Sequence, residues 1–268
     1  MSNADPAARG LSPCAELVRR HDPDRFFTAL FAPPARREAL FTLYAFNHEL
    51  ARAREVVSEP MLALIRLQWW REVVLGTPKR HEVATPLAAM IAQGLLLPAD
   101  LLAMIDGREA EADPAMPDRA AWDAYLSATA GAVMIAAGRA LGADDSALAR
   151  LARLGAAHGI AGQLRNVSIL ARAGRVLLPQ DVLGAHGLTV HDVTAGRGED
   201  NLRAALAELA REGQAVLASA RGPLPRAVIA AALPAVLARR DLTRATPPIA
   251  RGLGDRLAVL LARMIGRV

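Results

Sequence analysis

Apolar residues recur three and four positions apart along almost the whole chain, which is the spacing that places side chains on one face of an α-helix. Leu40, Leu43, Tyr44 and Leu50 show this spacing within one stretch. Proline and glycine interrupt it where turns are expected. The pattern predicts about ten helices and one short extended segment at 174–179; the helices cover 13–29, 35–58, 61–75, 86–94, 99–112, 120–141, 146–171, 201–221, 226–239 and 249–265.

The composition supports an all-α fold. Alanine, leucine and arginine dominate and aromatic residues make up only 4% of the chain, so strong helix formers outnumber the residues that strands prefer. The sequence shows neither a fixed-period repeat nor a low-complexity linker. With 268 residues, 53% of them hydrophobic, we expect one large helical bundle over 1–268, with a loose start at 1–12.

The charge and the single cysteine restrict the partners and the compartment. The net charge is +5, but arginines alternate with acidic residues and form no basic stripe with aromatics, so nucleic acid is not an expected partner. A weak attraction to anionic membrane surfaces fits at least as well. Cys14 has no internal partner for a disulfide, which favours a reducing compartment. We expect a cytoplasmic protein, either soluble or peripheral to the inner face of the membrane.

Generic metal sites are weakly represented. The histidines lack the spacing of paired metal ligands. An acidic group is more noticeable, because helical spacing places Asp106, Glu109 and Asp113 on one face, with Glu111 between them. That group could hold a divalent ion, but a solvated helix face is the more ordinary interpretation.

The segment 43–55, Leu-Tyr-Ala-Phe-Asn-His-Glu-Leu-Ala-Arg-Ala-Arg-Glu, resembles the first signature of squalene and phytoene synthases. In that family a Tyr-Ala-Phe-Cys-Arg stretch leads into an aspartate-rich run, whose carboxylates share one helix face and hold magnesium against a substrate diphosphate. In this chain Ala51, Arg52 and Glu55 occupy the aspartate positions, and His48 stands where the family has arginine.

The second signature is also recognisable. Residues 159–167, Gly-Ile-Ala-Gly-Gln-Leu-Arg-Asn-Val, and 174–179, Gly-Arg-Val-Leu-Leu-Pro, resemble the family's motifs on either side of its second aspartate-rich run. Between them this chain has only 168–173, which contains no carboxylate. Residues 67–71 and 125–133 resemble two further family helices, so that the likeness is strongest over 26–181. Both metal-binding runs of the family are therefore missing.

Within the family, the chain is most similar to the aspartate-depleted subgroup that contains the mitochondrial complex I assembly factor. The shared stretches are 45–51, 57–59 and 66–70. The resemblance implies the isoprenoid synthase fold, with the helices that hold 44–55 and 158–170 facing each other across a central cavity. It implies cavity or ligand-binding roles for Tyr44, His48, Arg52, Glu55, Gln163 and Asn166, with Gln163 and Asn166 beside Tyr44.

Three functions remain open on this basis. The first is a non-catalytic assembly or interaction factor with complex I subunits or assembly intermediates as partners, for which we expect no catalytic residue, no cofactor and no metal. The second is a transferase acting on prenyl diphosphates with altered Mg²⁺ ligation. The third is an isoprenoid- or lipid-binding protein that uses the cavity and is compatible with the first.

Four arginines and one glycine in the motif segments bear on which of these functions applies. Arg52, Arg54, Arg165 and Arg172 could bind diphosphate directly, although pairing with Glu49 and Glu55 or simple solvation is the more ordinary interpretation. Gly162 is expected in the cavity wall, at a close helix contact that Gly162→Arg would break.

Overall fold

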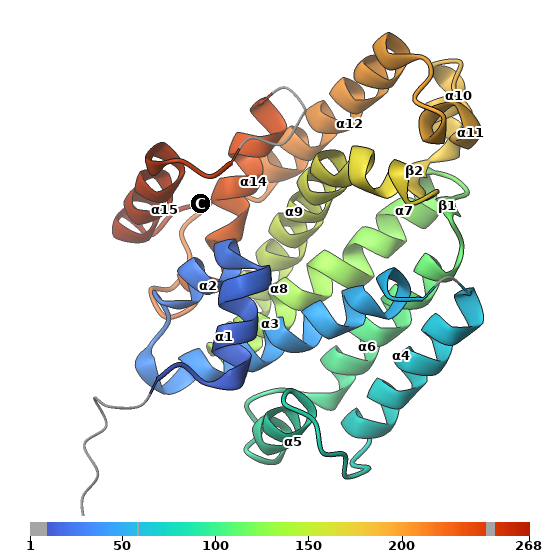
Figure 1. The fold of residues 1–268 in the computed structure, drawn as a ribbon. Coiled ribbons are helices and arrows are strands. Elements are labelled where there is room, and N and C mark those ends of the chain that lie inside the picture. Colours follow the sequence, from blue (N-terminus) through green and yellow to red (C-terminus); the bar gives the residue numbers. More distant parts are fainter. Residues whose placement is uncertain (1–9, 58, 245–249) are drawn as a thin grey trace, which may run out of the picture.

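The computed structural model describes residues 10–57, 59–244 and 250–268 (Figure 1). Its elements in chain order are α1 (Pro13–His21), α2 (Pro23–Ala29), α3 (Pro34–Glu55), α4 (Pro60–Val74), α5 (Ala84–Ala92), α6 (Pro98–Glu109), the 3₁₀ turn η2 (Ala110–Ala112), β1 (Ala115–Met116), α7 (Arg119–Leu126), the π-helical segment η3 (Ser127–Gly131), α8 (Ala132–Ala140), α9 (Asp145–Arg172), β2 (Val176–Pro179), α10 (Gln180–Ala185), α11 (Val190–Thr194), α12 (Glu199–Ser219), α13 (Ile229–Ala232), α14 (Pro234–Thr243) and α15 (Leu253–Ile265).

The all-α prediction is confirmed, and the differences in helix boundaries have local causes. The helix expected over 13–29 is two helices, because Pro23 starts α2 and the Asp22 carboxylate caps it by accepting a hydrogen bond from the Arg25 amide at 3.0 Å. The helix expected over 226–239 is likewise divided at Pro234, where α14 begins.

A parallel pair of short strands was not expected as a sheet. β2 coincides with the extended segment predicted at 174–179, and it pairs with the two residues of β1. The Trp122 indole, fully buried, donates a hydrogen bond to the Leu177 carbonyl at 2.9 Å and fastens β2 to α7. The short helices α10 and α11 follow directly and were also missed.

Helix α9 lies in the middle of the molecule, with α8, α12 and α14 packed around it (Figure 1). Its close approach to the π-helical segment depends on glycine. A Cβ atom at Gly155 would lie 2.7 Å from the Ala130 carbonyl oxygen and 2.7 Å from the Gly131 Cα, and one at Gly159 would lie 3.0 Å from the Ala130 Cβ. These two glycines, together with the small residues of η3, let α9 approach its neighbour at backbone distance.

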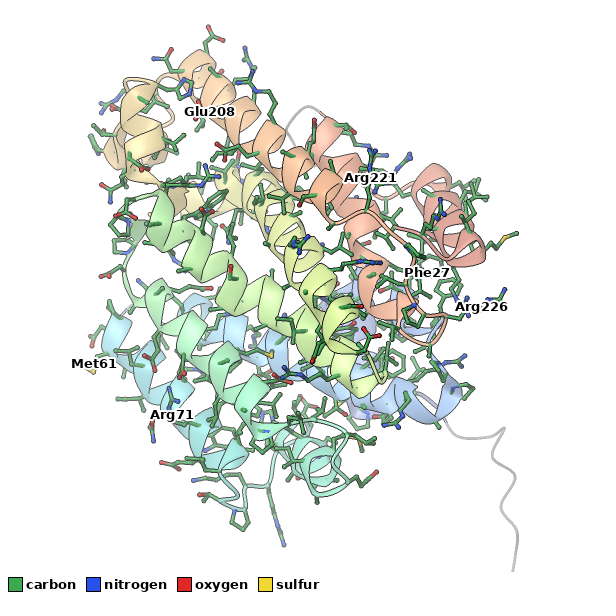
Figure 2. All side chains as sticks on the ribbon, turned by 180° about the vertical axis from the view of Figure 1, so that it is seen from behind. Phe27, Met61, Arg71, Glu208, Arg221 and Arg226 are labelled. Carbon is green, nitrogen blue, oxygen red and sulfur yellow. The ribbon has the colours of Figure 1, made fainter. Side chains whose placement is uncertain are left out.

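Figure 2 shows the side chains on the ribbon from the opposite side. One hydrophobic cluster runs through the bundle, and Phe46 of α3 is among its largest fully buried members. Met61 and Arg71 of α4 lie at one edge of the molecule, whereas Arg221 lies on the opposite side, near α15 (Figure 2). Helix α15 itself sits at the periphery and packs mainly against α14.

Candidate functional site

A cavity of about 540 Å³ lies between α3 and α9. Helix α3 contributes Asn47, His48, Ala51 and Glu55 to one wall, and α9 contributes residues from 158 to 170 to the other. The expected arrangement, with the two motif-bearing helices on either side of one central cavity, is confirmed.

Of the six residues predicted for this cavity, four line it: His48, Glu55, Gln163 and Asn166. Arg52 does not, because its guanidinium turns to Glu49 at 3.3 Å and its side chain is 40% exposed. Glu49 pairing was the ordinary interpretation of this arginine, and the ion pair supports it. A role for the other four in binding a ligand stays a prediction.

Tyr44 also lies outside the cavity lining, which corrects the expected position of Gln163. The Tyr44 ring is buried beneath the surface of α3, with the Arg25 guanidinium 5.6 Å from its centroid, and burial raises the pKa of its hydroxyl to about 12. The Gln163 amide instead donates to the hydroxyl of Tyr125, at 3.2 Å. The tyrosine of the cavity is therefore the one that α7 supplies.

The polar end of the cavity is built around the buried carboxylate of Glu111. It accepts hydrogen bonds from the Tyr125 hydroxyl at 2.7 Å, from Arg108 at 2.5 Å and from Arg175 at 3.2 Å. Arg108 also donates to the Asn47 side-chain carbonyl at 3.2 Å. Burial alone would raise the pKa of Glu111, but the two arginines and the tyrosine outweigh it, and the pKa is lowered. We refer to these five residues as the Glu111 cluster.

Sequence reasoning placed Glu111 with the wrong neighbours. Asp106 and Glu109 do lie on a partly exposed face, where both bind Arg71 at 2.7 and 2.8 Å, as the ordinary interpretation held. Helix α6 ends at Glu109, and the tighter 3₁₀ turn that follows changes the rotation per residue, so that Glu111 points inward. The spacing of Arg108 three residues before Glu111 was the available signal.

At the mouth of the cavity, Glu55 has no hydrogen-bond or ion-pair partner among the described residues. Burial and repulsion from Glu111 raise its pKa, and the nearby arginines offset this only in part. Glu55, which stands at a family aspartate position, is thus the one acidic residue that α3 contributes to the cavity lining.

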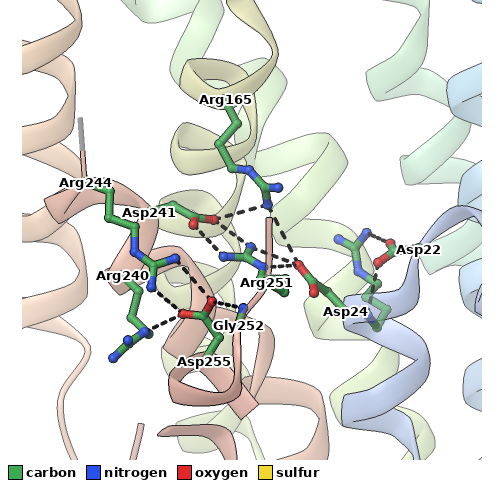
Figure 3. Close-up of polar contacts among 10 residues, drawn as sticks. Asp22, Asp24, Arg165, Arg240, Asp241, Arg244, Arg251, Gly252 and Asp255 are labelled. Atoms are coloured by element: carbon green, nitrogen blue, oxygen red, sulfur yellow. Dashed lines mark hydrogen bonds and ion pairs between the residues drawn. The ribbon is translucent and has the colours of Figure 1, made fainter. Parts of the chain in front are cut away.

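A second set of ion pairs crosses the other side of the cavity (Figure 3). Arg251 binds Asp24 at 2.9 Å and Asp241 at 2.5 Å, and Arg165 of α9 reaches Asp241 at 3.3 Å. Asp22 pairs with Arg25 at 2.8 Å. These contacts tie α2, α9 and α14 to Arg251, which lies two residues before α15.

Three of the four arginines proposed from the sequence as diphosphate ligands, Arg52, Arg54 and Arg172, do not line the cavity. Only Arg165 lines it, and that side chain is engaged by Asp241. Arg54 donates to the Val57 carbonyl at 2.8 Å. The arginines at the polar end are Arg175, which is buried, and Arg108, whose side chain is 15% exposed. The sequence motifs gave no reason to select them as a pair.

Histidines supply neutral polar groups to the same cavity. His48 stacks on His21 with ring centroids 4.4 Å apart, and the pKa of His48 is lowered by burial and by His21. His158 of α9 lies partly buried beside Arg25, and its pKa is lowered to about 4, mainly by loss of solvation and then by Arg25. The Nε2 atom of His48 and the Nδ1 atom of His158 are buried without a hydrogen-bond partner among the described residues. The hydrogen-bonding capacity of these two nitrogens is therefore unsatisfied within the described residues.

The residues at the cavity do not fit the magnesium cluster of an active synthase. Asp22, Asp24 and Glu111 are bound to arginines, Glu55 stands alone, and the α9 wall presents Gln163 and Asn166 instead of carboxylates. Within 10–57, 59–244 and 250–268, no three or more histidine, cysteine or acidic side chains are grouped so that they could hold a metal. A cluster of several magnesium ions needs two facing sets of carboxylates, and the described cavity residues do not form them.

Comparisons with known proteins agree with this architecture. The family model described as squalene/phytoene synthase matches residues 18–257. The complex I assembly factor 6 of Mus musculus is 30% identical over 84% of this chain and 69% of its own length. The presqualene diphosphate synthase of Rhodopseudomonas palustris is 26% identical over 88% and 91%. The squalene synthase of Alicyclobacillus acidocaldarius has the same fold, with a TM-score of 0.67 at 20% identity over 94% and 92% of the two chains. The chain belongs to the squalene/phytoene synthase family and has its all-α isoprenoid synthase fold.

Proposed function

We propose that this chain is a non-catalytic member of its family that acts as an assembly factor for respiratory complex I. The observation that carries the proposal is that the described residues of the cavity do not form two facing sets of carboxylates. Where the family's motif has two aspartate runs, the only carboxylate that α3 contributes to the cavity is that of Glu55, and the α9 wall contributes side-chain amides. Ionising an allylic diphosphate requires its developing negative charge to be neutralised, and magnesium normally does this. The residues left here are poorly suited to it.

The partner is proposed from similarity. Proteins named as complex I assembly factors from mouse and rat are each 30% identical to this chain over 84% of its length. This supports complex I subunits or assembly intermediates as partners, and work at the inner, reducing face of the membrane that contains complex I.

The cavity itself supports a retained ligand, an isoprenoid or another lipid. Its volume of about 540 Å³ is that of a small-molecule site. Apolar side chains such as Ile169, Leu170 and Leu177 share its wall with the polar Glu111 cluster and with His48 and His158. An amphipathic molecule could lay its tail along the first set and bond its head group to the second.

Deletion and rescue test the proposal. Loss of the gene should reduce assembled complex I on native gels and leave isoprenoid products unchanged. Glu55→Ala should restore assembly, because the lone carboxylate has no catalytic task. Normal complex I with depleted isoprenoids in the deletion strain would instead identify an enzyme.

A cavity-filling variant separates the cavity from the surface. Contrary to expectation, Gly162 is not a close helix contact, because a Cβ there would meet nothing within 4 Å. The crowded glycines of α9 are Gly155 and Gly159. Gly162→Arg should therefore fold, fill the cavity and fail to restore complex I. Gly184→Arg is the matched control, since Gly184 is exposed on α10 and equally uncrowded. Equal rescue by both variants would remove the cavity from the proposal.

A direct assay addresses the alternative transferase. Purified protein incubated with farnesyl or geranylgeranyl diphosphate and Mg²⁺ should release no more diphosphate than a heat-denatured sample. Presqualene diphosphate, squalene or phytoene above that background would restore the enzyme.

A further inference from the structure

The positive charge of this protein is concentrated in its last segment. Residues 220–268 contain nine arginines and two aspartates, a net charge of +7. The preceding 219 residues contain 23 basic and 25 acidic side chains, a net charge of −2. The arginines thus do collect on one part of the molecule, which the overall charge of +5 concealed.

Helix α15, at the centre of that segment, is packed with its small residues inward. Its inner face consists of Asp255, Ala258, Val259 and Ala262. Large apolar side chains point outward, and we call them the outer face of α15: Leu253, Leu257, Leu260, Leu261, Met264 and Ile265, all exposed. A surface helix of a globular protein normally buries its large apolar stripe, so this orientation is the reverse of the usual one.

Ion pairs from two partly exposed arginines to a buried carboxylate fix this orientation (Figure 3). The Asp255 carboxylate, 2% exposed, accepts hydrogen bonds from Arg240 at 2.6 Å, from Arg244 at 2.7 Å and from the Gly252 amide at 3.0 Å. Rotating the helix to bury its leucines would pull this carboxylate away from both arginines. The exposed apolar face is therefore held outward by the rest of the fold.

Arginines border the outer face on both sides. Along one edge, Leu261 and Ile265 line a groove of about 710 Å³ together with Arg221, Arg239 and Arg267. On the other edge, Arg256 and Arg263 each precede an outer-face residue by one position. Among the described residues, no carboxylate lies within ion-pair distance of these five arginines. Burial and Arg221 lower the pKa of Arg239, as expected for cations gathered without a counter-charge.

We propose that α15 and its bordering arginines dock this protein onto an anionic lipid bilayer, with the outer face inserted among the acyl chains and the arginines at the phosphate level. Exposed apolar residues flanked by cations are the pattern of interfacial helices. No helix of the described ranges combines the length and the hydropathy needed to cross a bilayer, so the contact is one of lying on the surface. The proposal does not depend on the complex I role.

Two other occupants fit the surface less well. A second copy of the chain in a two-fold dimer would bring the same arginines face to face without compensating acids. Nucleic acid would satisfy the arginines, but it would leave six large apolar side chains against phosphates and water. A bilayer of anionic lipids meets both requirements together.

Co-flotation of the full chain with vesicles tests the proposal. Binding to vesicles of phosphatidylcholine and phosphatidylglycerol should exceed binding to phosphatidylcholine alone and should weaken as salt is raised. Leu257→Gln with Met264→Gln should lower binding by about tenfold or more, because two inserted side chains are lost. Arg256→Gln with Arg263→Gln should lower it by about 25-fold, at roughly fivefold for each arginine near the surface.

Matched variants keep the test specific. Met61→Gln with Ile65→Gln removes equally exposed apolar residues from α4 at the far edge, and Arg211→Gln removes an exposed arginine from α12; both should bind like the wild type. Circular dichroism should show all variants folded. Vesicle binding that is absent, independent of anionic lipid, or equally affected by the control variants would overturn the proposal. So would dimerisation or DNA binding through the same residues without vesicle binding.

Discussion

Helices α9 and α15 both approach their neighbours through small residues, but α9 buries its large apolar side chains and α15 exposes them. Helix α9 is enclosed by α8, α12 and α14, and its Leu151, Leu154 and Ile160 are buried. Helix α15 has its main neighbour, α14, on one side, and it leaves Leu257 and Met264 in solvent. The periodicity of an alanine- and leucine-rich helix predicts that it has an apolar face. Whether that face is buried or exposed depends on the neighbouring helices and on buried charges.

Large apolar residues therefore stabilise the fold around α9, and on α15 they are available to bind a partner. Around α9, apolar and polar groups are enclosed, and each can affect the free energy of unfolding. On α15 the apolar groups contribute little to folding and remain available for a partner. Changes near α9 should therefore be costly for stability, and changes on the outer face of α15 should not.

The largest effect is expected from breaking the Glu111 cluster beside α9. Glu111→Ala leaves Arg108 and Arg175 buried without their carboxylate, which should cost about 3–5 kcal/mol of unfolding free energy. Urea denaturation measures the loss. Glu109→Ala is the matched control two residues away, where an exposed pair with Arg71 is worth at most about 1 kcal/mol. Similar losses in both variants would mean that the cluster does not act as a buried network.

His158 should make stability depend on pH. Its pKa is lowered from 6.5 to about 4 in the folded chain, mainly by burial and then by Arg25. Between those values the unfolded chain binds a proton at this ring and the folded chain does not. Above about pH 6.5 the ring is neutral in both states and leaves the free energy of unfolding unchanged. As the pH falls from 6.5 towards 4, protonation of the unfolded chain lowers the free energy of unfolding by up to about 3 kcal/mol.

Denaturation at several pH values checks this dependence. His158→Gln should flatten the curve between pH 6.5 and 4, and His191→Gln, at an exposed position, should leave it unchanged. An unchanged slope in the His158 variant would assign the acid sensitivity to the buried carboxylates instead.

Two glycines of α9 should respond to the same substitution with opposite signs. Gly155→Ala places a Cβ 2.7 Å from backbone atoms of η3 and should destabilise the protein by about 1–3 kcal/mol. Gly162→Ala meets open space and should stabilise it by up to about 1 kcal/mol, because alanine is the better helix former. Thermal unfolding of both variants gives the comparison. Equal signs would show that α9 does not approach η3 as closely as the structure has it.

Much of the fold and part of the cavity lining could be predicted from the sequence. Motifs placed His48 and Glu55 opposite Gln163 and Asn166 correctly, because both segments lie on long helices whose facing sides the family motif identifies. Tyr44 was expected in place of Tyr125, since the depth of a side chain beneath its helix is decided by packing. The inward direction of the Glu111 side chain was not predicted, because it depends on a single 3₁₀ turn after α6. No periodic pattern could have told which face of α15 was outside.

The smallest effect on stability is expected where the effect on binding should be large, on the outer face of α15. Leu257→Gln with Met264→Gln changes two side chains that are 57% and 74% exposed, so the free energy of unfolding should change by no more than about 0.5 kcal/mol. Val259→Ala, on the inner face of the same helix and fully buried, should cost about 1–2 kcal/mol. Urea denaturation of the two variants decides between the faces. A loss of 2 kcal/mol or more from the outer pair would mean that those residues pack against the protein in solution, and that the apolar surface of α15 belongs to the fold and not to a membrane contact.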